Sequence, residues 1–211
     1  MKPQLIKSSL YINLIVLAVV FSGCGVDPSS RHYYILDAAR RAAPAETDSE
    51  IVLEVQRFTT DSAFASKQLV YRKTEFEYES DFYDEFLIPP AAMLTEKTRN
   101  WLAQSGLFAR VLDPGSYTKP THTLQANITG LYVDVRDKKT PTAVMQIRLF
   151  LTPQQPAEKL VIFAQTYNAS VDVEAKTAEA FVQGFNRCLE QILTDLEKDL
   201  REQLQSSEEN L

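Results

Sequence analysis

The chain has few of the residues on which phosphate-binding and metal sites depend. It contains only six glycines and two histidines among 211 residues. The glycines form no glycine-rich phosphate loop, and no serine-centred nucleophile elbow occurs. The two histidines, His32 and His122, stand far apart in the sequence, whereas a metal site needs three or four ligands at a recognisable spacing. We therefore predict no metal and no cofactor.

Cysteine is nearly as scarce, because only Cys24 and Cys188 are present. If Cys24 is modified, as argued below, Cys188 has no partner within the chain, and the fold depends on packing rather than on disulfides. A nucleophilic Cys188 would need a nearby base such as His32 or His122. Its position between Phe185 and Leu189 on an apolar helical stripe instead favours a core residue.

Basic residues are outnumbered by acidic ones. Removal of a signal peptide with Lys2 and Lys7 leaves 20 Lys and Arg against 28 Asp and Glu, a net charge near −8. Binding of nucleic acid or of anionic lipid headgroups depends on basic patches. The composition therefore argues against both partner classes.

The sequence also lacks an apolar run long enough to span a bilayer, since residues 10–21 fall short of the roughly 20 residues required. This run follows the basic residues Lys2 and Lys7 and ends at Ser22-Gly23, directly before Cys24. A basic start, an apolar centre and small residues at the cleavage site are typical of a secretory signal. We predict a bacterial lipoprotein that is cleaved before Cys24 and acylated on the sulfur and amino group of that residue.

These boundaries divide the chain into a signal peptide (1–23), a lipidated tether (24–30), one domain (31–205) and a flexible tail (206–211). Several acyl chains anchor a protein firmly, because each buried methylene contributes about 0.8 kcal/mol. Lipoproteins with this signal and Gly25 after the cysteine resemble those that are sorted to the outer membrane. The expected location is therefore the outer membrane, with the domain facing the periplasm.

Within the domain, period-2 patterns predict a series of strands. The apolar alternation in residues 122–136 changes parity at Gly130, which predicts a β-bulge there. Residues 122–136, 143–152 and 160–173 are expected to form an antiparallel meander. The other predicted strands are 31–36, 51–58, 68–72 and 74–79, with a loop over 38–50.

Two helices are expected. Pro89 and Pro90 predict a helix start, and Gly106 a left-handed residue after a helix over 90–105. An apolar stripe from Val182 to Leu200 predicts a second, longer helix over 177–205. It is typical either of a coiled-coil seam or of a helix that covers a sheet. The expected fold is two-layer α+β, a mostly antiparallel sheet packed against two helices, the longer one C-terminal.

Acidic and aromatic residues alternate between Glu75 and Phe86. Paired carboxylates there would suit a glycoside hydrolase, but alternation of this kind is also typical of a strand with one wet face. The aromatic residues at the end of this segment are predicted to lie in a loop and contact a partner. They are Phe82, Tyr83 and Phe86.

The order of these features resembles that of the ABC-type transport auxiliary lipoprotein family. The matching pieces are Cys24, Tyr33-Tyr34-Ile35-Leu36, Leu69-Val70-Tyr71-Arg72, Phe76-Glu77-Tyr78, Trp101-Leu102, Ser105-Gly106-Leu107-Phe108 before Val111, the strand from Leu124 to Asp134, and the closing helix with Phe181 and Leu189. The resemblance implies a non-enzymatic protein without catalytic residues. It further implies docking to a mammalian-cell-entry domain protein in the transport of phospholipids or other hydrophobic solutes.

The expected function is therefore that of a lipid-anchored docking component, either as a single copy or as a homo-oligomer. An outer-membrane assembly lipoprotein that chaperones or plugs a β-barrel remains the alternative. A hydrolase that uses the acids of residues 75–85 is a third hypothesis.

Overall fold

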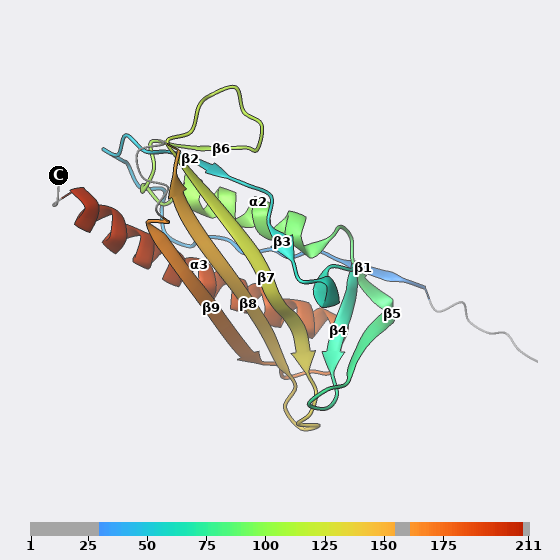
Figure 1. The fold of residues 1–211 in the computed structure, drawn as a ribbon. Helices are drawn as coiled ribbons and strands as arrows, with labels where there is room; N and C mark the ends of the chain where they lie inside the picture. Colours follow the sequence, from blue (N-terminus) through green and yellow to red (C-terminus); the bar gives the residue numbers. More distant parts are fainter. Residues whose placement is uncertain (1–29, 155–160, 209–211) are drawn as a thin grey trace, which may run out of the picture. The chain divides into compact units, whose positions relative to one another are not determined.

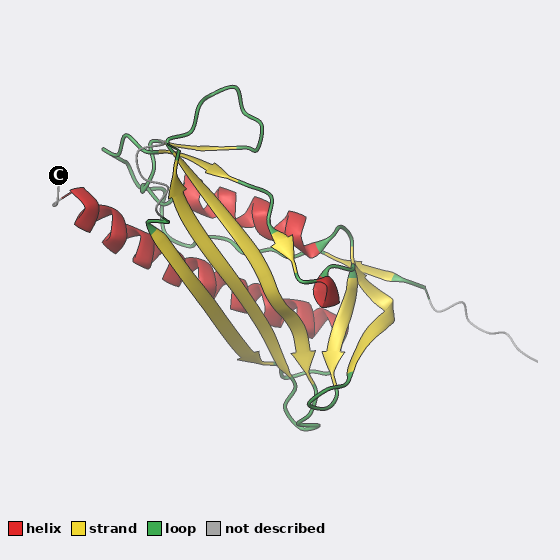
Figure 2. Ribbon diagram, viewed as in Figure 1, coloured by secondary structure: helices red, strands yellow, loops and turns green. Residues whose placement is uncertain are grey.

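The predicted series of strands with one shorter and one longer helix is present in the computed structural model of the chain (Figures 1 and 2). The structure describes residues 30–154 and 161–208. The predicted signal peptide, Cys24 and nearly all of the tether lie outside these ranges. Residues 31–211 form one unit, to which the following description applies.

The chain before the last helix consists mainly of strands, with one shorter helix between the fifth and the sixth of them. The elements in chain order are β1 (His32–Tyr34), β2 (Val52–Val55), β3 (Thr59–Thr60), the 3-10 turn η1 (Ser62–Phe64), β4 (Gln68–Arg72), β5 (Tyr78–Phe86), α2 (Pro90–Ala103), β6 (Arg110–Leu112), β7 (His122–Asp134), β8 (Thr142–Pro153), β9 (Phe163–Asp172) and α3 (Ala178–Glu208). Three short elements, β3, η1 and β6, were not predicted.

The strands belong to one mixed sheet in which the long ladders are antiparallel. β7, β8 and β9 form the predicted meander, and the register shifts between Ile128 and Gly130, which confirms the predicted bulge. β4 and β5 form an antiparallel hairpin. The parallel pairs of β7 with β2, β3 and β4, of β1 with β5, and of β2 with β6 are only two or three residues long.

Both helices lie on the same face of the sheet, the far face in Figure 1. The odd-numbered residues of β8 from Ala143 to Leu151 point to this face and are at most 2% exposed. The apolar stripe of α3 packs on them, with Phe185, Leu189 and Leu196 at most 1% exposed. Each such side chain contributes about 1.5–3 kcal/mol when fully buried. The stripe of α3 therefore covers the sheet of its own chain.

Helix boundaries agree closely with the prediction. α2 starts at Pro90, and Gly106 adopts the predicted left-handed conformation with φ of 70°. A Cβ on Gly106 would lie 2.7 Å from the Cβ of Ala45, so both the backbone conformation and the space require glycine. α3 continues to Glu208, three residues beyond the predicted end of the domain.

The strand predicted over 74–79 starts four residues too early, and only its residues 78 and 79 are extended. Residues 74–77 instead form the tight turn between β4 and β5. The Thr74 hydroxyl accepts hydrogen bonds from the N–H groups of Phe76 and Glu77, and the Lys73 N–H donates to the Glu77 carbonyl. These hydrogen bonds within the turn take the place of the interstrand hydrogen bonds that a strand at residues 74–77 would form. The strand begins only at Tyr78 and carries the acid-aromatic segment.

Candidate functional site

The largest group of exposed apolar side chains comes from β1, from β5 and from the residues after each of these strands. Each member is at least 40% exposed. We call this group the aromatic edge; its members are Tyr33, Ile35, Phe82, Tyr83, Leu87 and Ile88. β1 pairs in parallel with the end of β5, and the Leu87 N–H donates to the Tyr34 carbonyl, so the two segments are held side by side.

An irregularity in β5 projects Phe82 and Tyr83 from the sheet. Gln68 pairs with Glu85 and Val70 with Ser80, so β5 has several more residues than β4 between the two pairs. The Asp81 carboxylate accepts hydrogen bonds from the N–H groups of Tyr83 (2.8 Å) and Asp84 (2.9 Å). This Asx-type turn satisfies backbone groups that the ladder leaves unpaired. Phe82 and Tyr83 are consequently 69% and 44% exposed.

The two projecting rings have a defined arrangement. Phe82 and Tyr83 meet edge to face with ring centroids 5.1 Å apart. The Arg31 guanidinium lies 5.2 Å from the centre of the Phe82 ring and 3.7 Å from the Glu85 carboxylate. Rings that are already ordered lose less conformational entropy when a partner binds. The arrangement is therefore suited to protein–protein contact.

The prediction that Phe86 contacts a partner is wrong. Phe86 is 1% exposed and packs against Phe185 of α3, with ring centroids 6.2 Å apart. It belongs to the regular end of β5, where Phe86 pairs with Tyr34 in β1 and faces the helices. Phe82 and Tyr83 lie in a strand rather than in the predicted loop, and both are exposed.

No pattern in the sequence marks Tyr33, Ile35, Leu87 and Ile88 as surface residues. Residues 33–36 are all apolar, so a period-2 pattern cannot separate the exposed Tyr33 and Ile35 from the buried Leu36. The pairing of β1 with β5 decides which of them faces the helices.

The carboxylates of the acid-aromatic segment serve as hydrogen-bond acceptors beneath the aromatic edge. Tyr71 donates its hydroxyl to Asp81 at 2.7 Å, and Tyr34 donates to Asp84 at 3.0 Å. Burial by itself raises the pKa of Asp81, but hydrogen bonds from the Asp84 N–H, Tyr71 and the Tyr83 N–H outweigh it and lower that pKa. Burial and the bond to Asp84 raise the pKa of Tyr34 to about 12. A carboxyl group that acts as a general acid needs a raised pKa, whereas the pKa of Asp81 is lowered. This geometry therefore favours a structural role for Asp81.

Cys188 lies in the core, as predicted. It is fully buried, and its thiol donates a hydrogen bond to the Ala143 carbonyl at 3.3 Å. Burial raises the pKa of the Cys188 thiol to about 12.

The first prediction concerns this thiol. A pKa of about 12 makes the thiolate fraction at neutral pH about a thousandfold smaller than for a free cysteine. We expect a disulfide reagent such as DTNB to leave Cys188 unmodified in native buffer and to titrate it fully in denaturant. Rapid reaction in native buffer would show that this thiol is accessible and activated.

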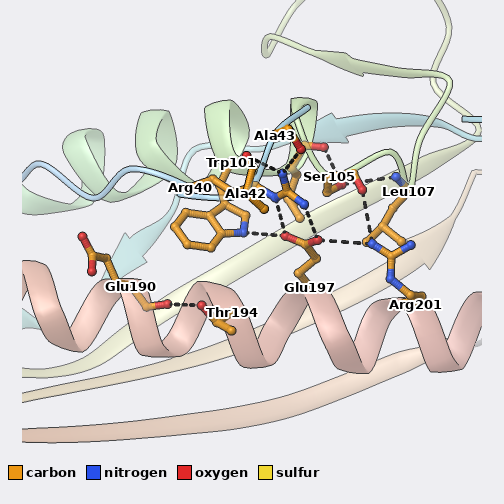
Figure 3. A network of polar contacts seen from close by, with 11 residues as sticks. Arg40, Ala42, Ala43, Trp101, Ser105, Leu107, Glu190, Thr194, Glu197 and Arg201 are labelled. Carbon is orange, nitrogen blue, oxygen red and sulfur yellow. Dashed lines mark hydrogen bonds and ion pairs between the residues drawn. The ribbon is translucent and has the colours of Figure 1, made fainter. Parts of the chain in front are cut away.

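A polar network holds the segment before β2 against both helices (Figure 3). The carboxylate of Glu197 on α3 is its centre. Arg40 donates to both oxygens of Glu197 at 2.8 and 3.0 Å, Trp101 of α2 donates its indole N–H at 2.9 Å, and Arg201 donates at 3.2 Å. Burial by itself raises the pKa of Glu197, but the bonds from Arg40, Trp101 and Arg201 outweigh it and lower that pKa. Glu197 is thus a structural anion.

The second prediction is that Glu197→Gln destabilises the domain by about 3 kcal/mol, since it leaves the buried Arg40 without its anion. A carboxylate with a lowered pKa stabilises the fold above its unfolded pKa, and this contribution is lost as the pH falls through the folded pKa. Denaturant unfolding should therefore show the variant and the parent converging below about pH 4.

Glu190→Gln is the matched control on the same helix. Glu190 pairs with Arg41, whose side chain is 86% exposed, so its loss should cost less than about 1 kcal/mol. Equal effects of the two substitutions would contradict the central role of Glu197.

Two further features bear on function. Among residues 30–154 and 161–208, no three His, Cys, Asp or Glu side chains gather in a way that could hold a metal ion. Within the same described ranges, none of the helices combines the length with the apolar composition that a bilayer span requires.

Comparison with known proteins gives one family. Residues 33–197 match the family described as the ABC-type transport auxiliary lipoprotein component. None of the proteins with curated descriptions matches the chain significantly.

Solved structures share the fold. A crystal structure of a protein from Xanthomonas campestris has a TM-score of 0.73 at 18% identity and covers 84% of this chain and 99% of its own. The crystal structure of an uncharacterized protein has a TM-score of 0.64 at 12% identity, with coverages of 81% and 99%.

Proposed function

The chain belongs to the ABC-type transport auxiliary lipoprotein family, and from that membership we propose a specific role. The protein is anchored in the outer membrane through acylated Cys24 and faces the periplasm. There it docks a mammalian-cell-entry domain protein of an ABC-type system that transports phospholipids or other hydrophobic solutes. Its contribution is protein–protein contact rather than catalysis.

The observation that carries this proposal is the extent of the family match. Residues 33–197 include two of the three residues of β1, the other strands and most of α3, so the match spans the aromatic edge as well as the core. An auxiliary component acts by contact, and the carboxylates and the thiol discussed above serve as structural groups.

The tether limits where such contacts occur. Seven residue steps separate Cys24 from Arg31, and at about 3.3 Å each they span about 23 Å. Arg31 also contacts Phe82. An acylated Cys24 would therefore keep the aromatic edge close to the membrane. A docking partner that bridges the two membranes would contact the domain there.

We assign the docking contact to Phe82 and Tyr83, supported by Tyr33, which lies on the adjacent strand β1 and pairs with Glu85. Aromatic residues dominate the binding energy of interfaces because they bury a large area with little loss of conformational entropy. The polar groups beneath them are satisfied within the chain, so the rings can be covered without leaving a buried carboxylate unpaired.

The third prediction tests the anchor. Cys24→Ala removes the acylation site, and the protein should move from the membrane pellet to the soluble periplasmic extract, or remain uncleaved. A Cys188→Ala variant is the control and should stay in the pellet, because Cys188 lies in the core. A Cys24→Ala chain that is cleaved after the signal and still stays in the pellet after carbonate washing would contradict lipid anchoring.

The partner is tested by purification of the full chain from solubilised membranes. The proposal predicts co-purification of a mammalian-cell-entry domain protein together with its ATPase. Recovery of a single outer-membrane barrel, without dependence on an inner-membrane ATPase, would instead support an assembly lipoprotein.

A further inference from the structure

β9 is a long sheet edge. It runs for ten residues, Phe163–Asp172, and pairs only with β8 among the described strands. Its ladder with β8 is regular, without a register shift. Figure 1 shows β9 at the outer side of the meander, farthest from β1. The other edge strands, β1 and β6, have three residues each.

The hydrogen-bond pattern shows which backbone groups of β9 point outward. The Val173 N–H donates to the Pro141 carbonyl at 2.9 Å, which continues the register in which Thr142 pairs with Asp172. In an antiparallel ladder, residues alternate between bonding toward one neighbour and toward the other side. Odd-numbered residues of β9 therefore bond to β8, and the groups that point outward belong to Ala164, Thr166, Asn168 and Ser170.

This edge lacks the features that usually prevent strand addition. Natural edge strands carry lysine, proline or a bulge, or they are short. β9 contains no proline and no glycine, and its one charged residue, Asp172, stands at its last position. Long edges of this kind are templates for pairing with another strand.

The edge is also held in place. The Tyr167 hydroxyl donates to Asp199 of α3 at 2.7 Å, and Arg187 of α3 donates to the Asp172 carbonyl at 3.2 Å. Tyr167 and Ala169 are 7% and 5% exposed on the helix-facing side. An added strand would meet an ordered edge, which lowers the entropic cost of pairing.

We infer that β9 pairs antiparallel with β9 of a second copy of this chain, around a two-fold axis at Asn168, so that the two sheets join. Among the described edges, only β9 itself matches β9 in length. A two-fold contact must be complementary to itself. This register sets Thr166 against Ser170, Asn168 against Asn168 and Asp172 against Ala164, so polar side chains face each other and no like charges are opposed.

The test uses the full-length chain with Asn168→Cys. On the two-fold axis, residue 168 faces its copy with Cα atoms about 5.5 Å apart, within the range of a disulfide. Mild oxidation should therefore give a covalent dimer. Arg148→Cys is the matched control, because Arg148 is exposed but lies on β8, inside the sheet. It should give none.

The oligomeric state of the chain in solution tests the pairing independently. Light scattering in detergent should show a dimer for the parent chain and at least a tenfold weaker dimer for Asn168→Lys, which opposes two lysines across the axis. A parent that is monomeric at all concentrations, a dimer that Asn168→Lys leaves intact, or an Asn168→Cys variant that crosslinks only to another protein would each overturn the pairing. A monomer that still captures the transport partner would leave the proposed function standing.

Discussion

A chain that ends after Arg187 is expected not to fold. The cut removes the C-terminal two thirds of α3, including seven buried side chains that cover the sheet. These are Cys188, Leu189, Ile192, Leu193, Leu196, Leu200 and Leu204, each at most 8% exposed. Truncation of one buried leucine or isoleucine to alanine already costs about 2–5 kcal/mol. A whole domain has a free energy of unfolding of only about 5–15 kcal/mol. The packing free energy lost with these seven side chains therefore exceeds the stability of the domain.

The cut also removes Glu197. Arg40 and Trp101 would then lose the carboxylate that joins them, and the segment before β2 would lose its attachment to α3. Circular dichroism and thermal unfolding are the measurements, and the truncated chain should show no cooperative transition. A chain that ends after Glu208, where α3 ends, is the control and should unfold like the parent. A soluble, cooperatively folded product of the first cut would contradict the two-layer packing.

The double variant Phe82→Ser/Tyr83→Ser is expected to lower partner capture at least tenfold while leaving thermal stability nearly unchanged. Exposed aromatic anchors at interfaces are worth about 2 kcal/mol or more each. Because Phe82 is 69% and Tyr83 44% exposed, their loss leaves no cavity in the core. Binding and folding should therefore respond differently to the same substitution.

Two controls separate a docking contact from a general effect. Tyr117→Ser removes a fully exposed aromatic residue outside the aromatic edge and should change neither capture nor stability. Phe86→Ser, on the same strand, should unfold the domain, because Phe86 is buried against Phe185. If the double variant captures the partner as well as the parent does, the docking contact lies elsewhere.

Sequence patterns predicted the elements whose apolar residues repeat regularly. The stripe from Val182 to Leu200 predicted α3, and a parity change at Gly130 predicted the bulge in β7, since apolar residues recur at every second position on both sides of that glycine. In both cases the local repeat and the tertiary packing require the same positions to be apolar.

The aromatic edge could be predicted only in part. The irregularity in β5 has no parity signal, because acids and aromatics occupy both faces of that segment. The burial of Phe86 depends on Phe185, about a hundred residues later in the chain. The pairing of Arg40 with Glu197, 157 residues apart, has no local signal either. These features arise when distant segments pack together, and a single sequence does not record which segments meet.

Photo-crosslinking from residue 82 of the Cys24-anchored chain tests the docking account most directly. A photoreactive phenylalanine analogue at position 82, with the same analogue at position 117 as control, would be activated in living cells, and the products identified by mass spectrometry. The account predicts a mammalian-cell-entry domain protein at position 82 and not at 117. A lone outer-membrane barrel at position 82, or the same products at both positions, would contradict it.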